Sequence, residues 1–307
     1  MKGGPMSGIT DVVMFSGGVG SWAAGKRVVK ARGSAEGVVL LFTDTMVEDD
    51  DLHRFLDEAA ESVGAPLVKI ADGRTPFDVF HDMRWIGNSR VAHCSAELKQ
   101  KPAREWIEAN CDPDRVTIHV GIDWTEIHRM RAVHAGYAHR GKCSDRDACR
   151  SLFDEDGRRP GPGCRNLLAQ PWSVNAPLTD APLVAKGSMI DSLKREGIEV
   201  PRMYREGFPH NNCGKQGCVR GGKDYWKHYL LMRPEEYLDT ERREEKLREE
   251  IGSQASILTE TVNGEERRVP LAEIRRRAEA QPSLFDGQEG EDWGGCGCMM
   301  DDPAALG

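Results

Sequence analysis

Short apolar runs that alternate with helical segments are the feature that most constrains how this chain can fold. The apolar runs, each of strand length, are residues 12–15, 38–42, 67–70, 116–122 and 167–172. Residues 22–31 suit a helix that Gly33 ends, and residues 50–63 carry apolar residues at helical spacing. Because strands that alternate with helices form parallel sheets, the order predicts an α/β fold with a doubly wound, mostly parallel five-stranded sheet.

The loop after the first apolar run, Ser16-Gly17-Gly18-Val19-Gly20-Ser21, suits phosphate binding. Consecutive glycines let backbone N–H groups approach a ligand, and the helix after the loop adds its positive N-terminal end. Ser16 and Ser21 would supply hydroxyl donors at the two ends of the loop. Ligands of parallel sheets bind at the carboxyl ends of the strands, so the position of the loop favours a nucleotide site over a plain strand-to-helix turn. The Gly-Lys-Ser/Thr ending of a Walker loop is absent, which disfavours a kinase or GTPase.

Four segments, in order, resemble the phosphoadenosine phosphosulfate (PAPS) reductase family of the PP-loop, or adenine nucleotide alpha-hydrolase, superfamily. They are the loop at 16–21, Phe42-Thr43-Asp44-Thr45, Cys94-Ser95-Ala96-Glu97-Leu98-Lys99-Gln100-Lys101-Pro102 and Arg202-Met203-Tyr204-Arg205-Glu206-Gly207-Phe208. The third segment has one residue more than the family spacing. The resemblance implies an adenine nucleotide alpha-hydrolase-like fold that binds ATP or PAPS, with Thr43 and Thr45 beside the nucleotide.

The loop departs from the family pattern at Gly20, where the family often has aspartate. The loop should still bind phosphate, but a metal contact from that aspartate would be absent. Asp44 then becomes the candidate ligand for Mg²⁺, and its alternative role is to cap the next helix. The same departure favours the possibility that the whole chain is a catalytically silent nucleotide-binding module.

Charged residues near the predicted strand ends are the candidates for catalysis. Glu126 and Arg129 come after the fourth strand, one helical turn apart, and could face the crevice together. The arginine fork suits a phosphate or sulfate, because it can bind two oxygens. The alternative is a surface ion pair of little energetic consequence. Lys99 would add positive charge near the phosphates, unless it is an ordinary surface residue.

The cysteines point to metal or redox chemistry, because nine of them in a chain expected in a reducing compartment do not suit a disulfide framework. Iron–sulfur members of the resembled family use a cysteine near the Lys-Pro segment and a pair after the Gly-Tyr segment. The candidate ligands at similar places, with a fourth from the C-terminal pair, are Cys94, Cys213, Cys218, Cys296 and Cys298. His93 stands where those members have a second cysteine. We expect a [4Fe–4S] cluster, with Zn²⁺ or free redox-active thiols as the alternatives.

Composition divides the chain into two parts. Residues 1–200 should form the nucleotide-binding domain, with a polar insertion at 140–165, and residues 201–307 a cysteine-containing, mainly helical extension with a flexible tail. No apolar stretch approaches the roughly 20 residues of a membrane helix, and no secretory signal is visible, so we expect a cytoplasmic protein without a membrane partner. A net charge of −8 argues against nonspecific coating of nucleic acid, although a local basic groove at 201–233 would be compatible with it.

The resemblance implies two reactions. In adenylating sulfur transfer, ATP activates a substrate oxygen as an AMP ester, and sulfur from a donor protein such as a cysteine desulfurase or a thioredoxin-like protein then displaces AMP. In thiol-dependent reduction of PAPS or adenylylsulfate, a mobile cysteine attacks sulfur. Gly295-Cys296-Gly297-Cys298 replaces the Glu-Cys-Gly-Leu-His segment of dedicated reductases, so we rank sulfur transfer first.

Aromatic residues in the basic segment raise DNA or RNA as the acceptor. Phe208, Tyr225, Trp226 and Tyr229 could stack on bases while lysines and arginines contact phosphates. The alternative is that these rings pack a helix against the core. A nucleic-acid acceptor is therefore a hypothesis that burial of the rings would weaken.

Overall fold

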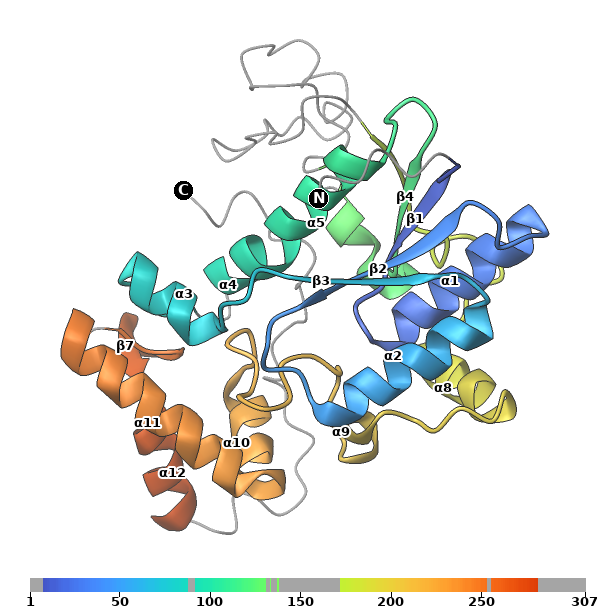
Figure 1. Ribbon diagram of the computed structural model, residues 1–307. Helices are drawn as coiled ribbons and strands as arrows, with labels where there is room; N and C mark the ends of the chain where they lie inside the picture. The colour runs from blue at the N-terminus through green and yellow to red at the C-terminus, as the bar shows by residue number, and fades with distance from the viewer. Residues whose placement is uncertain are drawn as a thin grey trace.

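A five-stranded parallel sheet lies at the centre of the fold (Figure 1). The computed structural model describes residues 8–87, 92–130, 133, 137, 172–252 and 255–280. The strands are β1 (Asp11–Met14), β2 (Val38–Asp44), β3 (Leu67–Ala71), β4 (Thr117–Val120) and β5 (Ser173–Asn175). They pair in the order β3-β2-β1-β4-β5, and every pair is parallel. The predicted doubly wound α/β fold is confirmed.

The predicted strands lie within a few residues of the observed ones, except the last. β5 begins at Ser173, directly after the predicted run at 167–172, of which residues 167–171 lie outside the described residues. The predicted helix at 50–63 is α2 (Asp50–Val63), and the helix predicted at 22–31 is α1 (Val19–Arg32). Gly33, with φ of 72°, ends α1 as expected.

The strand order places a topological switch point beside β1. The chain runs outward from β1 to β2 and β3 and then returns to the other side of β1 to form β4 and β5. Open parallel sheets bind ligands where the order reverses, outside the carboxyl ends of the strands. The loop after β1 and the segment after β4 therefore lie together at the expected ligand crevice.

Helices cover both faces of the sheet, as the side-chain alternation of the strands requires. Val13 and Leu40 point to the face packed by α1, α2 and α8 (Lys186–Arg195), whereas Val12 and Val39 point to the face packed by α5 (Lys101–Asn110). α5 is preceded without a break by α4 (His93–Ser95) and η1 (Ala96–Gln100). Both faces are thus apolar, which is the pattern of a buried parallel sheet.

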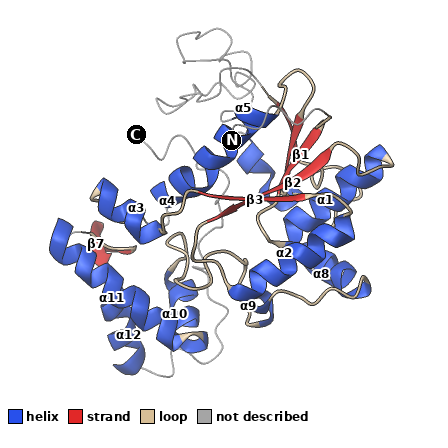
Figure 2. Cartoon of the chain, viewed as in Figure 1, coloured by secondary structure: helices blue, strands red, loops and turns tan. Residues whose placement is uncertain are grey.

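The described C-terminal part is mainly helical and packs beside the sheet domain (Figures 1 and 2). Its elements are α9 (Arg202–Arg205), α10 (Lys223–Met232), α11 (Pro234–Ile251), β6 (Leu258–Val262), β7 (Glu265–Val269) and α12 (Leu271–Ala280). β6 and β7 form an antiparallel hairpin that was not among the predicted elements. α3 (Pro76–Met83) contributes Phe77 and Phe80 to the same apolar core. No described helix is both long and apolar enough to cross a membrane.

The aromatic residues of the basic segment lie inside this core. Tyr225, Trp226 and Tyr229 are fully buried, and Phe208 is 3% exposed. Two of the phenols support the loop between α9 and α10, since the Cys218 N–H donates to the Tyr225 hydroxyl and the Tyr229 hydroxyl donates to a backbone carbonyl. The packing alternative therefore holds for these rings, and they do not form a platform for stacking bases.

A buried carboxylate organises the C-terminal part. Glu244 of α11 accepts hydrogen bonds from the backbone N–H groups of Ile257 at 2.9 Å and Leu271 at 2.6 Å. It thereby joins the start of the hairpin and the start of α12 to the long helix. Burial raises the pKa of Glu244 to about 7, because its hydrogen bonds offset only part of the cost of removing the carboxylate from water.

This pKa makes stability depend on pH. The folded chain retains a proton that the unfolded chain releases near pH 4.5, so we expect stability from Glu244 to be full below that pH and to be lost as pH rises through about 7. The loss should be about 3 kcal/mol, and urea unfolding at about pH 5 and about pH 8 measures it. Glu244→Gln should reduce the difference, whereas Glu249→Gln, at an exposed position of the same helix, should not. An unchanged pH dependence in Glu244→Gln would contradict the assignment.

Candidate nucleotide cleft and cysteine cavity

The loop between β1 and α1 is shaped by its glycines. Gly17 has φ of 77°, a conformation that favours glycine, and a Cβ there would lie 3.0 Å from the side chain of Leu52. Gly18 is the N-cap of α1 and has no side chain to cap the first-turn N–H groups. An α-helix offers these groups no internal partner. The loop therefore supplies backbone donors of the kind that phosphates require.

Gly20 lies where α1 approaches the end of β4. A Cβ on Gly20 would be 3.1 Å from the carbonyl oxygen of Gly121, and a Cβ on Gly121 would be 2.9 Å from the backbone nitrogen of Ser21. The two segments pack backbone to backbone, which leaves little room for a side chain at either glycine. Close backbone packing therefore favours glycine at both positions.

A cleft of about 410 Å³ opens in front of the loop. This volume falls within the range of about 300–1,000 Å³ that is usual for small-molecule sites. The polar and charged lining residues include Ser16, Ser21, Asp123, Thr125, Glu126, Arg129, Lys186, Tyr204, His210 and Asn212. Gly18 and Gly20 line it as well, so four of the predicted nucleotide-binding residues meet here.

Glu126 and Arg129 face this cleft together, as expected. Both lie in η2 (Trp124–Arg129), a turn of 3-10 helix that begins after Asp123, whose side chain accepts the Thr125 N–H at 2.8 Å. The Arg129 guanidinium donates to the Glu126 carboxylate, so the two residues also form the i,i+3 ion pair that was the alternative. The pair places one anionic and one cationic group on the wall of the cleft.

The lining residues from the second half of the chain were not among the predicted site residues, and Tyr204 and Lys186 are two of them. Tyr204 accepts the N–H of Val19, the first residue of α1, through its hydroxyl at 3.4 Å. The Nζ of Lys186 lies 5.0 Å from the centre of the Tyr204 ring and donates to the carbonyl of Pro209. Tyr204 stands in one of the resembling segments and could have been chosen from it, whereas no local signal distinguishes Lys186 from other lysines.

The predicted contacts from the end of β2 lie elsewhere. Asp44, Thr43 and Thr45 do not line the cleft, and neither does Gly17. Asp44 accepts the N–H of Met46 at 2.8 Å, and α2 is capped by Asp49 instead. The capping alternative for Asp44 is therefore wrong, and its contact with Mg²⁺ stays a prediction.

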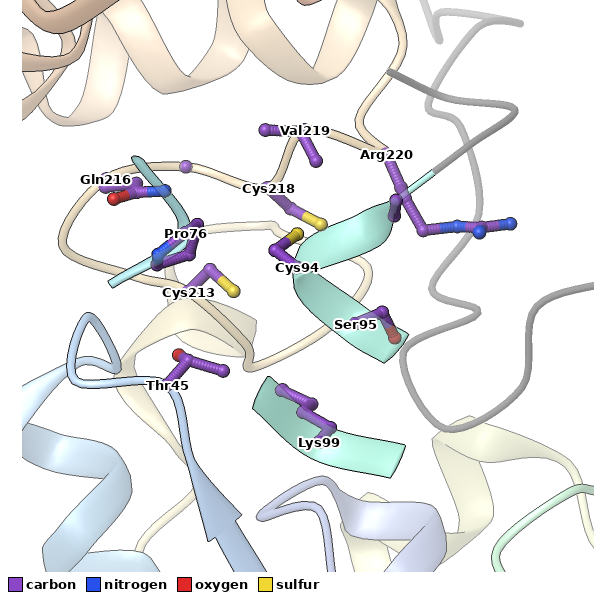
Figure 3. Close-up of a pocket in the computed structure, with 12 residues that line it drawn as sticks. Thr45, Pro76, Cys94, Ser95, Lys99, Cys213, Gln216, Cys218, Val219 and Arg220 are labelled. Atoms are coloured by element: carbon purple, nitrogen blue, oxygen red, sulfur yellow. The ribbon is translucent and has the colours of Figure 1, made fainter. Parts of the chain in front are cut away.

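Three of the five candidate metal ligands meet in a second, smaller cavity (Figure 3). Cys94 comes from α4, and Cys213 and Cys218 come from the loop between α9 and α10. Figure 3 shows their side chains converging on the cavity. Cys296 and Cys298 lie outside the described residues.

The cavity measures about 20 Å³, room for about one water-sized sphere. Three thiols are the donor type of zinc and iron–sulfur sites. Within the described part of the chain, however, no group of three or more His, Cys, Asp or Glu residues is arranged to hold a metal ion. The donors fit a thiolate-bound metal in kind, whereas the space in this conformation fits an ion rather than a cluster.

Lys99 lies at this cavity and not at the nucleotide cleft. Its ammonium is 3.1 Å from the Glu48 carboxylate, and the exposed fractions of the two side chains are 3% and 0%. The same carboxylate accepts the Thr45 hydroxyl at 2.9 Å and the backbone N–H of Cys213. The expectation that Lys99 adds charge beside the phosphates is not met here, because a buried carboxylate from the loop after β2 pairs with it.

The carboxylate next to Glu48 ties the C-terminal part to this loop. Asp49 accepts hydrogen bonds from Arg202, at 2.7 Å, and from Arg233. Although burial acts to raise it, hydrogen bonds from both guanidinium groups hold the pKa of Asp49 below its usual range. Arg233 also bonds Glu206, at 2.7 Å, so the network fixes the loop that carries Cys213.

The cleft and the cavity adjoin at Asn212 and Lys99. Asn212 lines the cleft, and its side-chain oxygen accepts a hydrogen bond from the Lys99 ammonium at 3.4 Å. Cys213, the next residue, lines the cavity. A ligand in the cleft that touched Asn212 would therefore contact the residue next in sequence to Cys213.

The buried pair should be important for stability. Lys99→Met leaves the Glu48 carboxylate buried without its cation, and losses of this kind cost about 3–5 kcal/mol in unfolding free energy. Lys99→Met/Glu48→Gln removes both charges and should recover part of the loss. Urea unfolding measures both, and Lys101→Met, at an exposed pair 3.5 Å from Glu97, should cost less than about 1 kcal/mol. Equal, small effects of Lys99→Met and Lys101→Met would contradict the burial of the pair.

No protein-family model matches the chain, and a search of curated proteins finds no match.

Proposed function

We propose that this chain is an ATP-dependent adenylating enzyme that transfers sulfur, related to the PAPS reductase family. The observation that carries the proposal is that two features of the structure adjoin. A helix N-terminus without an N-cap side chain opens into a cleft of about 410 Å³, and three thiols line a cavity behind the contact of Asn212 with Lys99. Adenylation needs the first feature, and sulfur chemistry needs the second.

The nucleotide half of the proposal uses the loop and the two cations of the cleft. Backbone N–H groups of Gly18, Gly20 and Ser21 and the Ser16 hydroxyl would bind phosphate oxygens. Arg129 and Lys186 would offset the charge that develops as pyrophosphate leaves the α-phosphate. Glu126, hydrogen-bonded to Arg129, would keep the guanidinium oriented toward the cleft.

The sulfur half uses Cys94, Cys213 and Cys218, with a fourth ligand from Cys296 or Cys298. A [4Fe–4S] cluster bound by them would supply thiolate-ligated iron for sulfur transfer, and the cavity would have to widen to admit it. Zn²⁺, which the present volume of about 20 Å³ admits, is the alternative. A reducing cytoplasm would keep these cysteines from forming disulfides, and a sulfur-donor protein would supply sulfur to the site.

Reductive chemistry has less support. None of the cysteines in the described ranges lines the nucleotide cleft, whereas a thiol that attacks a bound sulfonucleotide must reach into it.

A nucleic-acid acceptor also has less support, because the four aromatic rings are buried and most cations of the segment 201–233 are paired. The pairs involve Arg202, Arg205, Lys215, Lys223, Lys227 and Arg233. DNA or RNA stays a prediction of the sequence alone.

Pyrophosphate release from ATP tests the nucleotide half. We expect slow release by the purified chain, and a loss of about tenfold or more in Ser16→Ala, because one phosphate donor is removed. Ser34→Ala, at an exposed position after α1, is the matched control and should not change the rate. ATP binding without release would favour a silent nucleotide-binding module. Sulfite formed from PAPS and a thiol reductant, without pyrophosphate release from ATP, would favour the reductase instead.

Metal analysis of protein purified without oxygen tests the sulfur half. We expect bound iron and sulfide, strongly reduced in Cys213→Ser because that change removes a ligand. Cys111→Ser is the control, since Cys111 ends α5 and does not line the cavity. Stoichiometric zinc without sulfide would replace the cluster by Zn²⁺, and a metal-free chain would leave the thiols as the reactive groups.

A further inference from the structure

Three consecutive buried residues connect the two parts of the candidate site. Asn211 donates its side-chain amide to the carbonyl of Gly17, in the nucleotide loop, at 3.0 Å. Asn212 lines the cleft, and Cys213 lines the cysteine cavity. The exposed fractions of the three residues are 1%, 3% and 8%, so none of them can adjust by moving into solvent.

The bond from Asn211 acts on the peptide unit between Gly17 and Gly18. In a trans peptide the C=O and the N–H of the next residue point in opposite directions within one plane. A donor that holds the Gly17 carbonyl therefore turns the Gly18 N–H away from Asn211, and Gly18 lines the cleft. Gly17, at φ of 77°, has the freedom of glycine, so an external contact is needed to select one orientation.

The other end of this segment is anchored independently. Cys213 has φ of 56°, which is uncommon for a residue other than glycine, and its N–H donates to the Glu48 carboxylate. Lys215, two residues further on, donates its N–H to the carbonyl of Val47 at 3.0 Å. An unfavourable backbone conformation persists only where the surroundings over-determine it, and here the loop after β2 does so.

We propose that Asn211 is a positioning residue that sets the direction of the Gly18 N–H and transmits the conformation of the cysteine loop, residues 211–218, to the nucleotide loop. The role of the Gly18 N–H as a phosphate donor rests on the proposed function. The mechanical link between the two loops does not, because it depends only on the bonds from Asn211 to Gly17 and from Cys213 to Glu48. A change at Glu48 reaches the nucleotide loop through Asn211.

Amide hydrogen exchange by mass spectrometry tests the link without any ligand. Asn211→Asp keeps the shape of the side chain but replaces the donor by an acceptor, so exchange in residues 16–22 should rise about tenfold. Asn211→Ala is the second variant, in case the new carboxylate disturbs folding. Asn110→Asp is the matched control, because Asn110 also donates to a backbone carbonyl, that of Trp106 at 2.8 Å, and should leave residues 16–22 unchanged. Unchanged exchange in residues 16–22 of Asn211→Ala would overturn the proposal.

A double-variant cycle tests the transmission. Glu48→Gln should raise exchange in residues 16–22 when Asn211 is present and should add little in the Asn211→Ala background, whereas additive effects would overturn the link. The dissociation constant for ATP should rise about tenfold in Asn211→Ala, and Asn110→Asp should not change it. If the unaltered chain binds no ATP, the proposed function fails, and the exchange result still decides whether Asn211 positions the loop.

Discussion

The buried carboxylate of Glu48 is the interaction on which the arrangement of the site depends. Its three hydrogen-bond or ion-pair partners come from separate segments: Thr45 after β2, Lys99 in η1 and the backbone of Cys213. A buried carboxylate is costly wherever its donors are missing, so the three segments are stable only when they meet in one arrangement. The cysteine cavity depends on this requirement, because Lys99, Thr45 and Cys213 all line it.

Asp49 extends the same principle to the C-terminal part. As the N-cap of α2 it satisfies a backbone donor of the sheet domain, and it also binds Arg202 and Arg233 from the second half of the chain. Exposed ion pairs contribute little to stability, whereas a carboxylate with 1% exposure constrains the groups that must neutralise it. The acidic run after β2 therefore acts as a docking point for the C-terminal part.

The strand order of the sheet determines the position of the candidate nucleotide cleft, and segments distant in sequence form its walls. The reversal of strand order beside β1 brings Gly121 against Gly20, and the helix that starts there directs its N-terminus into the cleft. Tyr204 and Lys186 close the cleft from a part of the chain more than 150 residues away in sequence. The glycine-rich loop thus forms one wall of the candidate site, and residues between α8 and Cys213 form another.

The sequence by itself determined the sheet, its helices and the loop at 16–21, because apolar periodicity and glycine geometry act over a few residues. It also grouped Cys94, Cys213 and Cys218, because the order of the resembling segments indicated these cysteines. It also placed Glu126 and Arg129 on the cleft, since residues directly after a parallel strand must lie at the carboxyl edge of the sheet. Only the tertiary structure decided that Lys99 pairs with a buried carboxylate and that Lys186 joins the cleft. Whether a charge or a ring is buried depends on which distant segments pack against it, and the local spacing of residues does not predict that packing.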